Sequence, residues 1–510
     1  MEQRKKDNIG MIGLEIHVYL VTREKLFCRC KVVREKGTKP NSYICPVCTA
    51  QPGAKPMLPN KSAVEKAVQV AIMLGCKVNE KLTWMRKHYN WPDLPKGYQN
   101  TLSGARAFPV GEKGIFYGIK IREMHLEEDP ASWEPDTGKV DYNRSGLPLI
   151  EIVTEPDFST SEEVGNWLRK LLHNLQYLKA VASDAGIKAD VNINLVNVKF
   201  TSPEISKKQL EISGIEIPSN SVTLESEISN RHSRTKGDTI NGNVYIKGKT
   251  ERVEIKNVNS IENIQNAIEY ELNRQAREGS VRETRRFDEK EGKTTRMRGK
   301  EEQDDYRFIV DPDLLAIRLD KKFIEEMRER VPESPEVKLE KLVKKYKIGK
   351  DDAEVLSKNI EIVQFFEEVV EKGKVDAKFA LHWITIELLR HLNYNKTTLD
   401  KVEIKVKHFV ELLNAIKTGK ITELQGKEIL NKFYPSSFSL EEKGVEGKIS
   451  DSGELNKICK EVLNREKDVV LRYRAGEVKL LNFLVGEVMK KTDKRADFKV
   501  VRELLEEMME

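Results

Sequence analysis

Alternation of polar and apolar residues dominates the first part of the chain and predicts β-strands there. Successive side chains of a strand point to opposite faces, so that residues two apart share a face. Segments 13–20, 122–129, 149–155, 189–195 and 252–256 show this pattern, with mainly Ile, Leu, Val and Met at the apolar positions. We therefore expect an amphipathic sheet that packs one face on a core.

Apolar residues at helical spacing predict three helices among these strands and a different architecture after them. The three helices cover 62–74, 161–178 and 261–277, and the second is expected to start with the Ser-x-x-Glu sequence at Ser159. From about residue 313, helical spacing takes over. The helices predicted there cover 323–331, 335–347, 352–358, 360–372, 377–393, 406–417, 423–433, 455–464, 475–491 and 498–509.

These patterns predict an α+β protein with three parts. A sheet-rich domain covers residues 1–312, an all-helical domain covers 313–433 and a helical tail covers 434–510, with a Pro/Ser/Gly loop at the last boundary. Within the first domain, segment 201–250 is polar and poor in core residues. We expect a surface insertion there.

Composition and charge narrow the class of protein only a little. The chain has 510 residues, of which 39% are hydrophobic and 33% charged, and its 88 Lys and Arg nearly balance its 82 Asp and Glu. A net charge of +6 does not by itself indicate a nucleic-acid partner. No apolar run approaches about 20 residues, the length that spans a membrane, and no apolar signal core opens the chain, so we expect a cytoplasmic protein.

Four of the six cysteines lie close together in the sequence, as a C-x-C pair and a C-x-x-C pair. They are Cys28, Cys30, Cys45 and Cys48. In a long cytosolic chain such a cluster favours metal over disulfides, and two pairs joined by a short loop suit a structural zinc ion with four protein ligands. Four reduced, unrelated thiols are the alternative. Cys76 and Cys459 have apolar neighbours and are expected in the core.

The polar positions of the five strands carry acidic or short oxygen-bearing side chains and two histidines. A solvated sheet face is one interpretation, although such faces usually mix Lys, Thr and Glu. The other is a phosphoryl-transfer site, in which acids and histidine hold Mg²⁺ and basic side chains surround phosphates. The candidate Mg²⁺ ligands are Glu15, His17, Glu127 and Glu151. The candidate phosphate contacts are Lys256, Arg252 and Arg122.

No standard phosphate loop accompanies these residues. Segment 242–250, GNVYIKGKT, has five residues between its glycines where the P-loop has four, and it alternates like a strand. We interpret it as a chance near-match. The G-x-S-x-G sequence of serine hydrolases is missing as well.

Several long motifs, in one order along nearly the whole chain, carry a family resemblance. They are GLEIH at Gly13, CPVCTAQPGAKPMLPN at Cys45, RKHYNWPDLPKGYQ at Arg86, HLEED at His125, NRSGLPLIEIVTEPD ending at Asp157, DVNINL at Asp190, VEIKNVNS at Val253, ETRRFD at Glu283, RMRGKEEQDDYRF at Arg296 and RAGEVKLLNFLVGEVMK at Arg474. Together they resemble the B subunit of GatCAB-type aspartyl/glutamyl-tRNA amidotransferases. So many motifs in the right order are more specific than any single spacing.

The resemblance implies a fold and a reaction. The fold is a cradle domain with a zinc knuckle, then a helical domain and a YqeY-like tail that contacts tRNA. The reaction is that of a ligase: ATP converts the side-chain carboxylate of a Glu or Asp misacylated on tRNA into an acyl phosphate, and ammonia then displaces phosphate. The expected cofactors are ATP, Mg²⁺ and structural Zn²⁺.

The resemblance also implies roles for single residues. It gives His17, Glu127 and Glu151 as the Mg²⁺ ligands. The residues expected to take part in catalysis are Glu15, Asp190, Lys256 and Arg252. The residues expected to contact ATP are Lys256, Arg122 and Lys188, the last of which stands where the family has arginine.

The resemblance also implies partners. The chain has no Ser-rich amidase signature, so ammonia is expected to come from another protein, which the resemblance identifies as a glutaminase A subunit. The resemblance further implies a small C subunit that bridges the two and misacylated tRNA as substrate. Lysines of the tail are typical of a solvated face when taken alone. Trp383 and Phe483 lie at apolar helix positions and are expected in the core rather than stacked on bases.

Two other functions stay open at this point. The E subunit of the two-component archaeal glutamyl-tRNA amidotransferase shares GLEIH, although it carries a larger insertion, and the PDLPKGYQ sequence favours the B subunit. A non-catalytic, zinc-stabilised RNA-binding scaffold is the other. It would not require the acidic residues to converge at one point.

Overall fold

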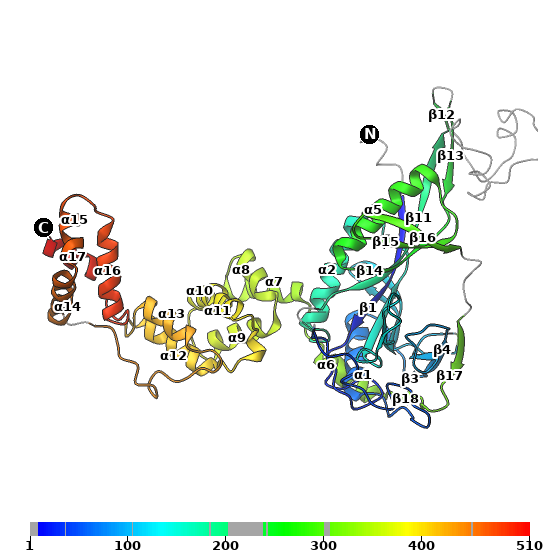
Figure 1. The fold of residues 1–510 in the computed structure, drawn as a ribbon, viewed down its shortest axis with the longest axis horizontal. Coiled ribbons are helices and arrows are strands. Elements are labelled where there is room, and N and C mark those ends of the chain that lie inside the picture. Colours follow the sequence, from blue (N-terminus) through cyan, green and yellow to red (C-terminus); the bar gives the residue numbers. More distant parts are fainter. Residues whose placement is uncertain are drawn as a thin grey trace, which may run out of the picture. The chain divides into compact units, whose positions relative to one another are not determined.

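The computed structural model describes residues 9–35, 37–104, 106–182, 185–201, 238–240, 243–299, 306–449 and 452–509. The chain forms two compact units, Met1–Pro332 and Glu333–Glu510 (Figure 1). The first contains the strands and the second is helical. The predicted α+β class is confirmed.

A large mixed sheet is the framework of the first unit. Neighbouring strands are antiparallel except for one parallel pair, β14 and β15. The strands run in the order β16 (Lys293–Gly299), β15 (Glu283–Asp288), β14 (Val253–Asn259), β11 (Lys188–Thr201), β1 (Ile9–Tyr19), β10 (Pro148–Thr154), β7 (Ile119–Glu128), β5 (Tyr98–Thr101), β4 (Met85–His88) and β17 (Arg307–Val310). Beside this path lie β2 (Lys77–Val78), β6 (Gly111–Phe116), β12 (Asp238–Ile240) and β13 (Asn243–Lys249). Two small sheets pair β3 (Lys81–Leu82) with β18 (Ile317–Arg318), and β8 (Ser132–Trp133) with β9 (Val140–Asp141).

All five predicted strands are present, and they are neighbours in space. They correspond to β1, β7, β10, β11 and β14, which follow one another in the sheet as β14-β11-β1-β10-β7. Their polar faces therefore form one surface. The sequence could not show this adjacency, because strands close in space lie far apart along the chain.

Helices cover the apolar face of this sheet. Among the described residues of the first unit, the helices are α1 (Lys61–Met73), α2 (Ser161–Tyr177), α5 (Ile261–Glu278) and α6 (Lys321–Arg330). Helix α5 lies along β11, β14 and β16 (Figure 1). Ile12, Leu14 and Ile16 of β1 are buried in one core with apolar residues of α1, α2 and α5. The acidic face of these strands therefore lies on the side of the sheet away from these helices.

The second helix begins at Ser161, as predicted, but its N-cap lies one residue later than expected. Thr160, rather than Ser159, is its N-cap, and the Thr160 side chain accepts a hydrogen bond from the Glu163 backbone N–H. The Glu163 carboxylate in turn accepts from the Ser159 backbone N–H, at 2.8 Å. The capping interaction is therefore present, with its register moved by one residue.

The predicted insertion 201–250 lies largely outside the described residues. Its described part forms β12 and β13, and β13 pairs with the end of β11. The segment that resembles a phosphate loop is therefore mostly a strand. Helix α6, assigned from the sequence to the helical domain, packs in the first unit beside α1.

The second unit is built from helices around two apolar cores. Its helices are α7 (Pro335–Tyr346), α8 (Lys350–Ser357), α9 (Ile360–Glu371), α10 (Ala377–His382), a π-helix (Trp383–Leu388), α11 (Leu389–Tyr394), a short 3₁₀ helix (Leu399–Lys401), α12 (Val406–Lys417), α13 (Glu423–Asn431), α14 (Ser452–Arg465), α15 (Lys467–Arg474), α16 (Leu480–Lys491) and α17 (Phe498–Met509). The predicted division near residue 433 stays a prediction. None of the described helices is long and apolar enough to cross a membrane.

Two predictions in the second unit are wrong. The helix expected at 475–491 begins at Leu480, because a turn containing Gly476 at φ +108° precedes it, and the separate helix α15 was not predicted. Phe483 was expected in the core but is 47% exposed. Trp383 is buried, as predicted.

Candidate functional site

Three adjacent strands bring His17, Glu127 and Glu151 together on the polar face of the sheet. His17 on β1 lies opposite Glu151 on β10, which in turn lies opposite His125 on β7. One ligand atom from each of His17, Glu127 and Glu151 lies within 4.8 Å of the others. The Nε2 atoms of His17 and His125 lie 3.7 and 3.8 Å from the same Glu151 oxygen.

Burial and mutual contact perturb every charge in this triad. Burial disfavours the Glu151 carboxylate, but contact with His125 and His17 outweighs burial and holds its pKa well below the usual value. Burial and the Glu151 charge raise the pKa of Glu127. Burial alone would lower the pKa of His17, yet contact with Glu151 raises it to about 9. Such opposed shifts among close groups are typical of functional sites.

A second acidic cluster, Glu15, Asp190 and Glu254, lies beside the triad. Its ligand atoms are also within 4.8 Å of one another. Glu15 is two residues from His17 on β1 and lies opposite Asp190 on β11. Burial, followed by the charges of Glu151 and Asp190, raises the pKa of Glu15. The two clusters therefore influence each other electrostatically.

Lys256 is the cation of this second cluster. Its Nζ lies 3.3 Å from Asp190 Oδ2 and 2.9 Å from Glu254 Oε1. The Thr284 hydroxyl donates to the other Glu254 oxygen at 3.2 Å. Glu254 was not predicted as a site residue, although it shares the polar face of its strand with Lys256.

The other predicted cationic side chains, those of Arg122, Lys188 and Arg252, are more exposed than that of Lys256. Arg122 forms a two-pronged ion pair with Glu155, with both N–O distances 3.0 Å, and is half-exposed. Lys188 lies opposite His17 in the register, and its side chain is exposed. Arg252 precedes β14 and is also exposed. Of the residues predicted to contact phosphate, Lys256 is the one that pairs with the cluster of Glu15, Asp190 and Glu254.

Several residues beside the triad were not predicted as site residues. The Tyr19 hydroxyl donates to Asp129 at 2.6 Å, and Arg144 Nε lies 3.0 Å from the same carboxylate. His125 is buried, and its Nδ1 has no hydrogen-bond partner among the described residues. Alternation had placed Tyr19, His125 and Asp129 on polar faces, and Arg144 lies in the motif that ends at Asp157, but none of the four was predicted as a site residue.

The four cysteines of the knuckle converge as predicted. All four Sγ atoms lie within 4.8 Å of one another. Cys48 Sγ is 4.0 Å from Cys30 Sγ and 3.9 Å from Cys45 Sγ. Tetrahedral zinc with Zn–S bonds of about 2.3 Å requires sulfurs about 3.8 Å apart. The geometry fits a closed zinc site and disfavours four unrelated thiols. Cys76 and Cys459 are buried in the apolar cores, as expected.

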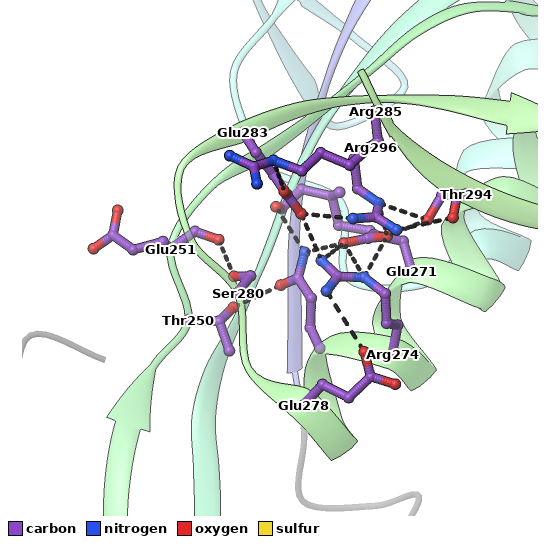
Figure 2. A network of polar contacts seen from close by, with 12 residues as sticks. Thr250, Glu251, Glu271, Arg274, Glu278, Ser280, Glu283, Arg285, Thr294 and Arg296 are labelled. Carbon is purple, nitrogen blue, oxygen red and sulfur yellow. Dashed lines mark hydrogen bonds and ion pairs between the residues drawn. The ribbon is translucent and has the colours of Figure 1, made fainter. Parts of the chain in front are cut away.

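A buried ionic network joins α5 to strands β15 and β16 (Figure 2). Strand β15 pairs with β14, which carries Lys256. Glu271 on α5 has no exposed surface and accepts hydrogen bonds from Arg274 at 2.6 Å and Thr294 at 2.7 Å. Glu283 on β15 accepts from Arg285 at 2.7 Å. These side chains lie on the helix-facing side of β15 and β16, whereas Thr284 faces the opposite side and contacts Glu254. The network therefore fixes the strand that orients Glu254.

Comparison with known proteins decides the family. A model described as the GatB/GatE catalytic domain matches residues 10–234 and 238–325, and a second, described as the GatB domain, matches 364–509. The chain belongs to the GatB family. The match to the second model, which is described for GatB alone, agrees with the resemblance to the B rather than the E subunit.

Full-length relatives agree with this assignment. A protein of Methanothermobacter thermautotrophicus, named as the B subunit of an aspartyl/glutamyl-tRNA(Asn/Gln) amidotransferase, is 40% identical over 506 residues, which cover 97% of this chain and 99% of the relative. Relatives of the same name in Methanocaldococcus jannaschii and Methanopyrus kandleri are 40% and 37% identical, each over 98% of this chain and 97% and 98% of their own lengths.

Proposed function

We propose that this chain is the subunit of a tRNA-dependent amidotransferase that activates the side-chain carboxylate of Glu-tRNA(Gln) or Asp-tRNA(Asn) with ATP and amidates it. Family membership supports the reaction class. The observation that carries the proposal within the structure is the convergence of His17, Glu127 and Glu151 beside Glu15, Asp190 and Lys256 on one sheet face. A non-catalytic scaffold would not require this convergence.

The proposed reaction has two steps, phosphoryl transfer from ATP and attack by ammonia. A carboxylate is a poor electrophile, because its oxygen does not leave. Transfer of the terminal phosphoryl group of ATP to that oxygen forms an acyl phosphate and releases ADP. The lone pair of ammonia then attacks the carbonyl carbon, phosphate leaves with the electrons of the C–O bond, and the nitrogen loses a proton.

The triad supplies a cation site for the first step. His17, Glu127 and Glu151 would hold Mg²⁺ in the proposal, and the cation would supply positive charge that stabilises phosphoryl transfer. Mg²⁺ favours oxygen ligands and retains waters or phosphate oxygens, so two carboxylates and one imidazole leave room for substrate. The proposed role of Lys256, which pairs with two carboxylates, is to stabilise phosphate oxygens. Arg122, Arg252 and Lys188 are proposed to contact ATP or phosphate from the rim.

Glu15 suits the second step. A general base works best when its pKa lies near the working pH. Burial and the neighbouring acids raise the pKa of Glu15. We assign Glu15 as the acceptor of the proton lost by the attacking nitrogen, with Asp190 positioning Lys256 next to it.

The proposal requires partners. Ammonia comes from a glutaminase A subunit, and a small C subunit joins the two. The helical tail contacts the tRNA, and the cysteine site holds structural Zn²⁺. The assembly works in the cytoplasm with the other machinery of translation.

Amidation by a reconstituted complex tests the proposal. The chain with its A and C partners is given ammonia, ATP and Mg²⁺, with Glu-tRNA(Gln) or Asp-tRNA(Asn) as substrate. Amide should form only when ATP and this chain are both present. Glu127→Ala should lower the rate at least about a hundredfold, because it removes a ligand from the cation that stabilises phosphoryl transfer.

The matched control is Glu134→Ala, since Glu134 is an exposed carboxylate of the same unit outside both acidic clusters. It should amidate at the wild-type rate. Wild-type amidation by Glu127→Ala would remove this residue from the site. The absence of ATP-dependent product with either tRNA, from an intact complex, would contradict the proposed function.

A further inference from the structure

A lysine is buried against the cysteine cluster. Lys25 is 1% exposed, and its Nζ lies 3.6 Å from Cys48 Sγ and 3.1 Å from the Tyr142 carbonyl oxygen. A buried ammonium group is strongly unfavourable unless a negative charge accompanies it. The carbonyl oxygen is neutral, so the cysteine sulfurs provide the negative charge.

The backbone around Lys25 is tied to the cluster from both sides. The Lys25 backbone N–H donates to the Cys30 carbonyl at 3.0 Å, and the next residue donates to the Gly146 carbonyl at 2.8 Å. The Lys25 stem and Cys48 lie beside Gly146, whose φ is +83°, at van der Waals distance from where a Cβ would stand. The Ser145 hydroxyl donates to the Cys48 carbonyl at 2.8 Å. These bonds fix the Nζ–Sγ contact from two directions.

A closed zinc–thiolate site has an electrostatic problem that such a lysine solves. Four thiolates outweigh a divalent ion, so the filled site carries excess negative charge in a partly buried position. A cation in contact with one sulfur offsets that charge and orients the ligand. We infer that Lys25 is the counter-cation of the four-cysteine site: it donates a hydrogen bond to the Cys48 thiolate and links the metal site to the turn at Tyr142–Gly146.

This link has a consequence for the acidic face of the sheet. The turn leads directly into β10, which carries Glu151. Within the turn, Arg144 contacts Asp129, and the Gly146 backbone N–H donates to the Asp129 carbonyl at 2.9 Å. The cysteine site and Lys25 thus support the ends of β7 and β10. The inference rests on zinc in the cysteine cluster and does not depend on the reaction proposed above.

Zinc affinity of the full-length chain tests the inference. Lys25→Met removes the charge and keeps an unbranched apolar stem. In competition with a chromophoric chelator, it should bind Zn²⁺ about 10- to 100-fold more weakly than wild type, the range measured for residues that orient metal ligands. The control is Lys31→Met, which removes an exposed lysine next to Cys30 and should leave affinity unchanged.

A second readout separates charge from packing. With Co²⁺ in place of zinc, the thiolate-to-metal charge-transfer band should shift in Lys25→Met and stay in place in Lys31→Met, because a hydrogen bond from Lys25 stabilises the sulfur lone pair. Should Lys25→Met fail to fold, Lys25→Arg and Lys25→Gln replace it. The arginine variant should bind Zn²⁺ at least about tenfold more tightly than the glutamine variant.

Three results would overturn the inference. The first is wild-type zinc affinity and an unshifted band in Lys25→Met. The second is equal affinity of the arginine and glutamine variants. The third is a purified chain that neither contains zinc nor binds it.

Discussion

At the scale of single residues, the proposed cation competes with a proton for His17. Burial disfavours the charged form of His17, but contact with Glu151 prevails and raises its pKa to about 9. A metal ligand must be the neutral imidazole, so below about pH 9 the cation displaces a proton. The raised pKa of Glu127 adds to this competition.

The affinity of the triad for Mg²⁺, or for Mn²⁺ as a probe, should therefore rise with pH. The sign follows from the raised pKa of His17: lower pH favours the protonated form, which excludes the metal. One displaced proton gives up to about a tenfold gain in affinity per pH unit below the pKa. Calorimetric titrations between about pH 7 and about pH 8.5 measure it. An affinity that does not change over this interval would show that His17 is already neutral.

Most residues of the candidate site could be predicted from alternation alone, but their ion pairs could not. Alternation places His17, Glu127 and Glu151 on polar faces without any knowledge of the fold. It cannot show which cation each acid contacts, because ion pairs form across strands. The ion pair of Arg122 with Glu155, for example, was not predicted, and the expected role of Arg122 at the phosphates stays a prediction. Glu254 was missed because a single acid two residues before a lysine is common on solvated faces.

At the scale of elements, the junction of α5 with β15 and β16 depends on buried charge. Glu271 is fully buried, within reach of Arg274 and 3.6 Å from Arg285. Removing one partner of a buried pair leaves the other charge without compensation, which costs about 3–5 kcal/mol. Glu271→Ala should therefore destabilise the first unit by about that amount.

Glu278→Ala provides the control for this prediction. Glu278 lies on the same helix, 3.9 Å from Arg274, but its side chain is 60% exposed. Its removal should cost less than about 0.5 kcal/mol. Urea unfolding followed by tryptophan fluorescence compares the two, since Trp84 and Trp167 are buried in the first unit. Similar losses of stability in both variants would show that the network contributes no more than a surface pair.

The errors in element prediction have physical causes. Helix α15 is short and has no buried residue, so it lacks the apolar stripe by which a helix is recognised. The start of α16 was set too early because Gly476 interrupts a run that is otherwise favourable for a helix. Phe483 is apolar but lies off the buried stripe formed by Leu481, Leu484 and Val485.

At the scale of the whole molecule, local pattern and long-range arrangement contribute differently. Periodicity predicts strands, helices and the change of character along the chain, but not the order β14-β11-β1-β10-β7 that assembles the acidic face. In that order the apolar faces of the strands pack in one core with α1, α2 and α5. The family motifs supplied the reaction, which no periodicity contains, and the structure shows their acidic residues on one surface.

The central claim is that the carboxylate on tRNA is activated as an acyl phosphate on this chain. The most direct test uses Glu-tRNA(Gln) labelled with heavy oxygen in its side-chain carboxylate, amidated by the complete complex with ammonia and ATP. Mass spectrometry of the inorganic phosphate then measures the label. The proposed mechanism predicts one labelled oxygen transferred to phosphate for each amide formed, and it predicts that Glu127→Ala slows both together. Amide formed with unlabelled phosphate would contradict it.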